Sequence, residues 1–134
     1  MTEQVDYSID HPLEDAALNA LFGDSWPAHS PRAFGPILTR SLGTVSAFVA
    51  DRLVGFVNLA TDGGEHAFLL DPTVHPAFRR RGIGLQLVRR AALLACERGC
   101  RWLHADYEAQ LEPYYRAAGF RESTAGVMLL TPTA

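Results

Sequence analysis

Apolar runs in the middle of the chain predict a β-sheet. Residues 45–50 and 53–61 form two such runs, and the polar dipeptide Asp51-Arg52 between them indicates a two-residue hairpin. Asp62-Gly63-Gly64 is a second strong turn signal. It leads into a third run that begins at Glu65 or His66 and ends at Val74. We therefore expect a meander of three antiparallel strands.

A long helical pattern follows this meander. Its apolar face contains Ile83, Leu87, Val88, Ala91, Leu94 and Ala95. Arg98 and Gly99 have the residue types expected at the end of a helix. Residues 102–105 then predict a strand, and this strand should lie parallel to the third strand of the meander because a helix connects the two by a right-handed crossover.

Weaker patterns occupy the first part of the chain. Residues 5–9 predict a short strand, and Asp10 or His11 then caps a helix that has Pro12 at its first position and stops at Gly23. A second short helix is expected to start at Pro31, after a segment that prolines interrupt.

The last part of the chain predicts one helix and one or two strands. The helix extends from Leu111 to Ala118 and ends at Gly119. Residues 127–130 predict the last strand, and residues 120–122 are a candidate for a further one. We expect residues 1–134 to form a single domain of the α/β class, with an α+β mixed sheet.

Charge is distributed unevenly along this mildly acidic chain, whose formal net charge is −3. Residues 1–31 contain six acidic residues and no basic residue, whereas the 12 basic residues are all arginine and five of them lie between 79 and 90. A local basic patch on an acidic protein fits a small polyanionic ligand better than a nucleic acid. Salt-dependent nucleic-acid binding through Arg79, Arg80, Arg81, Arg89 and Arg90 remains a minor alternative.

Other classes of protein are disfavoured by the sequence. Cys96 and Cys100 have no partners at the spacing of a metal site, so we expect no metal. No run approaches the roughly 20 apolar residues of a membrane span, and the first residues contain no apolar signal region. We expect a cytoplasmic protein that has no membrane partner and is a monomer or a homodimer.

The basic turn Arg79-Arg80-Arg81-Gly82-Ile83-Gly84 carries the clearest chemistry. The first amides of a helix are unpaired and lie at the positive end of its dipole. The two glycines let a ligand approach the backbone, and arginine suits phosphate oxygens. Together these features predict a phosphate or pyrophosphate site. A solvated basic helix start with glycines for packing is the alternative.

This turn resembles the pyrophosphate-binding motif Arg/Gln-x-x-Gly-x-Gly/Ala of the GNAT superfamily of acetyl-CoA-dependent N-acetyltransferases. Val74-His75-Pro76, just before it, and the order of the predicted elements also resemble that family. The resemblance implies a GNAT-like acyl-CoA N-acyltransferase fold, in which a mostly antiparallel sheet carries helices on both faces and a central parallel strand pair splays apart around the acetyl-CoA thioester. Acetyl-CoA is then the co-substrate, held by Thr73, Val74, Arg79, Arg80, Arg81, Gly82, Ile83 and Gly84.

A second motif lies in the last predicted helix. Residues 114–120 resemble the Phe-Tyr-x-x-x-Gly-Phe motif of the family, and Tyr115 falls on its tyrosine. In these enzymes that tyrosine commonly protonates the departing thiolate of coenzyme A, and general acid catalysis is typically worth about 10²–10⁴ in rate. The alternative is a tyrosine that packs the short helix onto the sheet. The arginine turn upstream, in the expected order, favours the acid.

Two departures from the family pattern concern the reaction itself. Relatives often polarise the thioester carbonyl with the backbone N–H two residues before the motif valine, but this position is Pro72, which has no N–H. Either a bulge shifts the register so that Thr73 or Val74 donates, or the contact is lost. The positions at which some relatives carry the base are Leu70 and Phe68. Asp106 and Asp71 are therefore the preferred bases, ahead of Glu108, His66 and His104.

The acceptor is less well defined by the sequence. The predicted helix-loop-helix of the first part should cover one edge of the active site, which makes Trp26, His29 and Phe34 candidates for contacts with the acceptor. Trp26 and Phe34 serve equally well as core anchors. Acidic residues such as Glu108 suggest a cationic small-molecule amine as acceptor. An acyl-CoA-binding or sensor module that is catalytically weak or inactive is the alternative to an N-acetyltransferase that acts by direct transfer.

Overall fold

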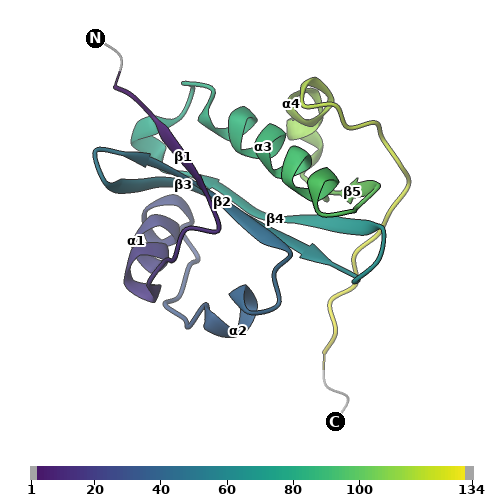
Figure 1. The fold of residues 1–134 in the computed structure, drawn as a ribbon, viewed down its shortest axis with the longest axis horizontal. Helices are drawn as coiled ribbons and strands as arrows, with labels where there is room; N and C mark the ends of the chain where they lie inside the picture. The colour runs from purple at the N-terminus through teal and green to yellow at the C-terminus, as the bar shows by residue number, and fades with distance from the viewer. Residues whose placement is uncertain (1–2, 132–134) are drawn as a thin grey trace.

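A five-stranded sheet forms the centre of the computed structural model, which describes residues 3–131 (Figure 1). The strands lie in the order of the chain, and they are β1 (Asp6–Ile9), β2 (Gly43–Val49), β3 (Arg52–Thr61), β4 (His66–Val74) and β5 (Trp102–His104). Neighbouring strands are antiparallel except for β4 and β5, which are parallel. The mixed sheet predicted from the sequence is therefore confirmed.

Helices cover both faces of this sheet. Figure 1 shows α1 (Asp15–Ser25) and α2 (Gly35–Leu38) on one side, with α3 (Ile83–Glu97) and α4 (Glu112–Ala117) on the other. Two short 3₁₀ turns, η1 (Pro76–Phe78) and η2 (Ala109–Leu111), precede α3 and α4. The helix-connected parallel pair β4–α3–β5 agrees with the crossover expected from the sequence.

Each layer of helices has its own apolar core. The α3 side contains the larger cluster, in which Leu87 and Val88 of α3 pack against strand residues such as Val45 and Leu59. The α1 side contains a smaller cluster formed by Leu18, Leu21, Phe22, Phe34 and Phe56. Because successive residues of a strand face opposite sides of a sheet, Phe56 and Val57 enter different clusters.

The β2–β3 hairpin turns one residue earlier than the sequence suggests. Ala50 and Asp51 both have positive φ angles, of 47° and 68°, as the central residues of a type I′ turn require. Arg52 is already the first residue of β3. The polar dipeptide thus predicted the hairpin, but the backbone conformation sets its register.

The helix boundaries in the first part of the chain differ from those expected. Helix α1 begins at Asp15, so neither Asp10 nor His11 caps it. The carboxylate of Asp10 instead accepts a hydrogen bond from the Thr44 N–H at 2.9 Å and pairs with Arg98 at 2.7 Å. Gly23 does not end the helix, since its backbone hydrogen bonds continue to Trp26.

The expected C-terminal strand is absent from the part of the chain that the structure describes. Residues 120–131 contain no strand, and the side chains of Val127, Met128, Leu129 and Leu130 are 82–86% exposed. The apolar pattern is present, but neither edge of the sheet pairs with this segment within the described residues. A run of apolar residues indicates what could be buried and does not specify the partner.

Candidate active site

A bulge in β4 shapes the strand that the sequence marked as one wall of the site. The pairing of β3 with β4 shifts between Phe56 and Asn58, so that Leu70 pairs with Asn58 and Thr73 with Phe56. Asp71 lies in the extra length of chain and has a positive φ of 54°. A bulge of this kind re-aims the residues around it.

The bulge is followed by backbone groups of Val74 that point away from β3. The His75 N–H donates to the Val54 carbonyl on β3 at 2.8 Å, and successive N–H groups of a strand point to opposite sides. The Val74 N–H therefore faces the β5 side, where β4 has no paired residue beyond Phe68. Its carbonyl accepts a hydrogen bond from Arg79 Nε at 3.1 Å. Of the two N–H donors suggested by the sequence, this geometry favours Val74 over Thr73.

The three arginines of the turn have different surroundings. Arg79 is held by the Val74 carbonyl, and Arg81 pairs with Glu3 at 3.2 Å and lies over the ring of Phe78. Arg80 has a positive φ of 64° and is exposed. Among residues 3–131, no carboxylate lies within ion-pair distance of its guanidinium. Arg80 is thus the member of the turn with its charge free for an anion.

The glycines of the turn fit a ligand that approaches the backbone closely. Gly82 precedes α3 in the left-handed conformation, with φ 80°, and Ile83 is buried beneath the turn. A β-carbon added at Gly84 would lie 2.8 Å from the hydroxyl oxygen of Tyr114 and 3.5 Å from Val74 Cγ2. Gly84 therefore makes room for Tyr114, whereas an added β-carbon at Gly82 would meet no atom within 4 Å. The open space at Gly82, the unpaired first amides of a long helix and the charge of Arg80 suit the diphosphate of coenzyme A.

Tyr115 lies in a stack of aromatic rings. Its ring is parallel to that of Tyr107, with 4.2 Å between the centroids, and meets Phe120 edge to face at 5.5 Å. The side chain is 4% exposed, and burial raises the pKa of Tyr115, with a further increase from the nearby charge of Asp106. Tyr115 therefore stays protonated at neutral pH. The stack fits the packing role considered from the sequence and leaves the proton-donor role a prediction.

Tyr114 is the residue that sequence reasoning missed. Its hydroxyl lies against Gly84, at the end of the turn, whereas the sequence motif drew attention to its neighbour Tyr115. Burial, followed by the proximity of Tyr115, raises the pKa of Tyr114 to about 12. A neutral phenol at this point can donate a hydrogen bond. The signal in the sequence was the doubled tyrosine, which by itself did not show which ring faces the turn.

Trp26 links the first helix to β4. Its indole N–H donates to the Thr73 hydroxyl at 3.1 Å, and Thr73 in turn donates to the Asp71 carbonyl at 2.9 Å. The Thr73 side chain is buried, and Trp26 remains 48% exposed. Asp71 also faces this side, where Arg32 lies 3.9 Å from its carboxylate. An exposed indole and a carboxylate thus border the same stretch of β4.

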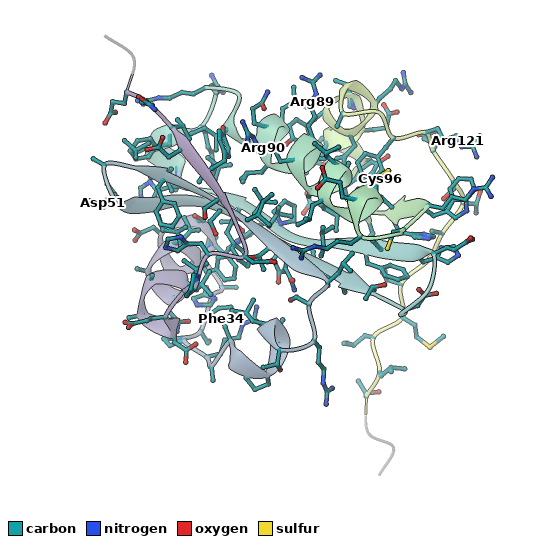
Figure 2. The ribbon with its side chains drawn as sticks, viewed as in Figure 1. Phe34, Asp51, Arg89, Arg90, Cys96 and Arg121 are labelled. Atoms are coloured by element: carbon teal, nitrogen blue, oxygen red, sulfur yellow. The ribbon has the colours of Figure 1, made fainter. Side chains whose placement is uncertain are left out.

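Phe34, expected to contact the acceptor, is instead a core residue. It is 2% exposed and packs edge to face against Phe22 at 5.3 Å. Figure 2 shows it on the α1–α2 side of the sheet, opposite Arg89 and Arg90 of α3. His29 likewise lies against Phe22 and forms a hydrogen bond with Asn19 at 2.9 Å. Both therefore support the helix-loop-helix from within.

Asp106 and Glu108 lie together on the other side of the gap between the parallel strands. With Tyr107 they form one wall of an open hollow of about 440 Å³, whose opposite wall is Ala125, Gly126 and Val127. Both carboxylates are exposed. The remaining proposed bases, His66 and His104, hydrogen-bond to each other at 2.7 Å at the paired end of the strands. The site thus presents acidic groups on both sides of the gap.

The mixed sheet, with an arginine-glycine turn beside a parallel strand pair that separates, is the architecture of acyl-CoA-dependent transferases. A family model described as the acetyltransferase (GNAT) domain matches residues 43–122. The chain belongs to this family of acetyltransferases, whose acyl donor is acetyl-CoA, and the resemblance drawn from its two motifs is confirmed.

Sequence relatives with curated names match shorter parts of the chain. A probable glucosamine 6-phosphate N-acetyltransferase 2 from Oryza sativa subsp. japonica is 40% identical over 60 residues, which are 45% of this chain and 36% of that protein. The mycothiol acetyltransferase of Mycolicibacterium smegmatis is 39% identical over 79 residues, which are 58% of this chain and 25% of that protein. The matched stretches thus span about a quarter to a third of these relatives.

Solved structures share the fold over almost the entire chain. A GNAT family acetyltransferase from Streptococcus pneumoniae TIGR4 has a TM-score of 0.83 at 20% identity, covering 97% of this chain and 100% of its own. The aminoglycoside N-acetyltransferase AAC(6')-Iy in complex with CoA has a TM-score of 0.75 at 19% identity, covering 99% and 98%. These similarities establish the fold class.

The described part of the chain lacks both a membrane-spanning helix and a cluster of metal ligands. Among residues 3–131, no helix combines the length and the apolar character needed to cross a bilayer. The same residues contain no group of three or more histidine, cysteine, aspartate or glutamate side chains that could hold a metal ion.

Proposed function

We propose that this protein is an N-acetyltransferase that moves the acetyl group of acetyl-CoA directly to the primary amine of a small acceptor. The observation that carries the proposal is the position of Val74, whose backbone N–H faces the gap beside β5 while Arg79 ties its carbonyl to the anion-binding turn. Two relatives named as N-acetyltransferases, of glucosamine 6-phosphate and of aminoglycosides, support an amine acceptor.

The turn and β4 would hold the donor from two directions. The first amides of α3 and the guanidinium of Arg80 bind the diphosphate, and the open space beside Gly82, where no atom lies within 4 Å of an added β-carbon, makes room for it. The Val74 N–H is placed to bind the oxygen that becomes negative during transfer. Loss of one such donor typically lowers the rate by about 10²–10³, so the bulge compensates for the missing N–H of Pro72. Acetyl-CoA supplies the activated acyl group as a thioester.

Proton transfers are assigned to neutral tyrosine and ionised carboxylate. Tyr115 donates a proton to the departing sulfur, since its raised pKa keeps the phenol protonated. Asp106 or Asp71, directly or through water, takes a proton from the ammonium group of the acceptor, and the resulting neutral amine attacks the thioester carbonyl. The exposed carboxylates of Asp106 and Glu108, together with Trp26 across the gap, favour a cationic acceptor with an apolar face.

The test is thiol release from acetyl-CoA across a panel of primary amines, with the wild type and the Tyr115→Phe variant. We expect turnover with at least one amine and a loss of about 10²–10⁴ in kcat for the variant, because only the proton is removed and the ring stack remains. Tyr7→Phe is the matched control, since Tyr7 lies on β1 and contacts Arg90. Full turnover in Tyr115→Phe would remove this residue from the mechanism.

A module that binds acyl-CoA without turnover is the second candidate. The observation that favours it is the character of β4, where Phe68 and Leu70 occupy the positions of the base in some relatives and Pro72 lacks an N–H. This alternative predicts that coenzyme A raises the melting temperature while no amine in the panel releases thiol. Thiol release that requires the presence of a particular amine would show that the protein is an enzyme and would exclude this alternative.

A further inference from the structure

The end of α1 is tied to β4 on either side of Val74. The Asp24 carboxylate lies 3.1 Å from Nε2 of His75. The indole N–H of Trp26 donates to the Thr73 hydroxyl, also at 3.1 Å. Because successive residues of a strand face opposite sides of a sheet, Thr73 and His75 both face α1, whereas Val74 faces Gly84 of α3. Val74 therefore lies between two side-chain ties that come from the same helix end.

The hydrogen bonds of His75 determine which nitrogen of its ring carries the proton. Nδ1 accepts a hydrogen bond from the Ala77 N–H at 3.1 Å, so this nitrogen has no proton. The proton is then on Nε2, which donates it to the carboxylate of Asp24. The guanidinium of Arg52 lies 3.1 Å from the same Nε2, which has no lone pair left to accept from it. The two nitrogens of one ring thus connect α1 with η1.

Strand pairing supports this part of β4 from one side. Within residues 3–131, β4 pairs with β5 only at residues 66–68, so Thr73 and Val74 have a paired strand only in β3. Just before them, Pro72 has no N–H and Asp71 has the positive φ of the bulge. A short stretch between a bulge and a 3₁₀ turn therefore depends on its side chains for a fixed position.

His75 also joins Val74 to the turn that leads into α3. Its N–H donates to the Val54 carbonyl at 2.8 Å, and its carbonyl accepts from the Phe78 N–H at 2.9 Å. Its imidazole meets the ring of Phe78 edge to face, with 5.9 Å between the centroids. The side chain of His75 is 13% exposed, so it is enclosed by these partners. A shift of this ring would therefore displace both the end of β4 and the start of the arginine turn.

We propose that Thr73 and His75 are positioning residues for acetyl transfer. The end of α1 holds both side chains, and they in turn fix the Val74 N–H at the place where the thioester oxygen binds. The inference rests on the proposed function, in which this N–H stabilises the negative charge that develops on the oxygen. Such a donor is effective when it is already in place before the reaction, and locked supporting side chains provide this.

The experiment compares the binding of acetyl-CoA with that of S-ethyl-CoA, a thioether of the same length that lacks the carbonyl oxygen. Titration calorimetry of the unmodified chain should show about two- to tenfold tighter binding of acetyl-CoA, the value of one hydrogen bond from the Val74 N–H. Equal affinities would overturn the proposal. The ratio is measured without an acceptor amine. A positioning role that fails is thereby distinguished from a proposed function that fails, in which case no amine would release thiol.

Two matched pairs of variants cut each tie or keep it. Thr73→Val removes the hydroxyl that Trp26 binds and keeps the shape of the side chain, whereas Thr73→Ser keeps the hydroxyl. Asp24→Ala removes the acceptor for His75, whereas the amide oxygen of Asp24→Asn still accepts. We expect the preference for acetyl-CoA to be lost in Thr73→Val and Asp24→Ala and to be largely retained in the other two.

The ratio of the two affinities separates positioning from a general loss of structure. A damaged site would weaken both ligands equally and leave the ratio unchanged, and circular dichroism melting curves check that each variant folds. Glu97→Ala, which removes an exposed carboxylate from the last residue of α3, is the control and should keep the preference. A preference that survives in Thr73→Val and Asp24→Ala, or that is lost equally in Thr73→Ser and Asp24→Asn, would overturn the proposal.

Discussion

Gly84 and Tyr114 depend on each other across the start of α3. The hydroxyl of Tyr114 occupies the space that a β-carbon at position 84 would need, at 2.8 Å, whereas the next nearest atoms lie at 3.5 and 3.6 Å. The conflict thus involves one oxygen atom. We therefore expect that any side chain at position 84, which the sequence motif marks only as small, requires Tyr114 to move.

We predict strong coupling between substitutions at these two residues. Gly84→Ala should destabilise the protein and weaken coenzyme A binding, because the methyl group forces Tyr114 to move. Tyr114→Phe removes the obstructing oxygen, so the double variant should recover stability by roughly 0.5–3 kcal/mol relative to the sum of the single changes. Chemical denaturation of the four proteins measures this term. Gly23→Ala, at a helical glycine with nothing within 4 Å, is the control; simple additivity in the 84/114 pair would refute the coupling.

The sequence located the site at the level of motifs and less well at the level of single side chains. The glycine-arginine turn was readable because helix starts and glycines have local physical requirements. The direction in which the Tyr114 side chain points and the buried position of Phe34 depend on how the helices pack onto the sheet. No local sequence pattern contains this information. The bulge at Asp71 was raised only as one of two outcomes of Pro72, since a register shift depends on the partner strand.

At the scale of elements, Asp10 joins three parts of the fold. It ends β1, accepts a hydrogen bond from Thr44 on β2, and pairs with Arg98 at the end of α3. Arg98 also donates to the Leu42 carbonyl at 2.7 Å. Burial alone would raise the pKa of Asp10, but the hydrogen bonds from Arg98 and Thr44 outweigh burial and lower it below 3.8.

From the lowered pKa of Asp10 we predict how the stability of the protein changes in acid. Asp10 contributes stability above its ordinary pKa, and the contribution is lost as the pH falls through the lower pKa of the folded state. Asp10→Asn keeps an acceptor for Thr44 but loses the charge, and it should cost about 0.5–1 kcal/mol at pH 7, since both partners are partly exposed. The difference from wild type should vanish in strong acid. Denaturation curves of both proteins at several pH values measure it, and a difference that stays the same at every pH would contradict the prediction.

The sequence predicted elements best where apolar residues recur at a regular spacing and turn residues mark the ends. The meander, α3 and the parallel return to β5 have continuous apolar patterns that only one arrangement satisfies. The start of α1 was misplaced because Asp10 and Pro12 are as suitable for a helix start as for the link to Arg98 that the fold makes. The last strand was predicted from an apolar pattern that pairs with no strand among residues 3–131.

At the scale of the whole molecule, binding of a polyanion opposes the net charge. The chain carries −3 overall, whereas the turn at the start of α3 is locally positive. At ordinary ionic strength, salt screens the interaction between charges that are more than about 8–10 Å apart. The attraction of coenzyme A therefore depends on the charges of the turn itself and little on the net charge. Neither Arg79 nor Arg80 pairs with a carboxylate of the described residues, but Arg79 donates to the Val74 carbonyl, which leaves Arg80 as the arginine of the turn without a side-chain partner there.

We accordingly predict a salt-dependent affinity for coenzyme A in which Arg80 has the largest share. Arg80→Ala should weaken binding roughly tenfold at low salt and flatten its dependence on salt, as expected for the loss of one charge-assisted contact. Titration calorimetry at several salt concentrations measures both quantities. Arg40→Ala removes an exposed arginine near α2 and should leave them unchanged; an equal effect of the two variants would assign the attraction to overall charge.

The exclusive use of arginine around the turn has a chemical consequence. No residue of the chain is lysine, so none of its side chains carries an aliphatic amine. A lysine beside a bound thioester would be a competing nucleophile, and its acylation would erase the charge that attracts the donor. Guanidinium groups stay protonated and resist this reaction. The protein can therefore remain in prolonged contact with its own reactive substrate without being modified on a basic side chain.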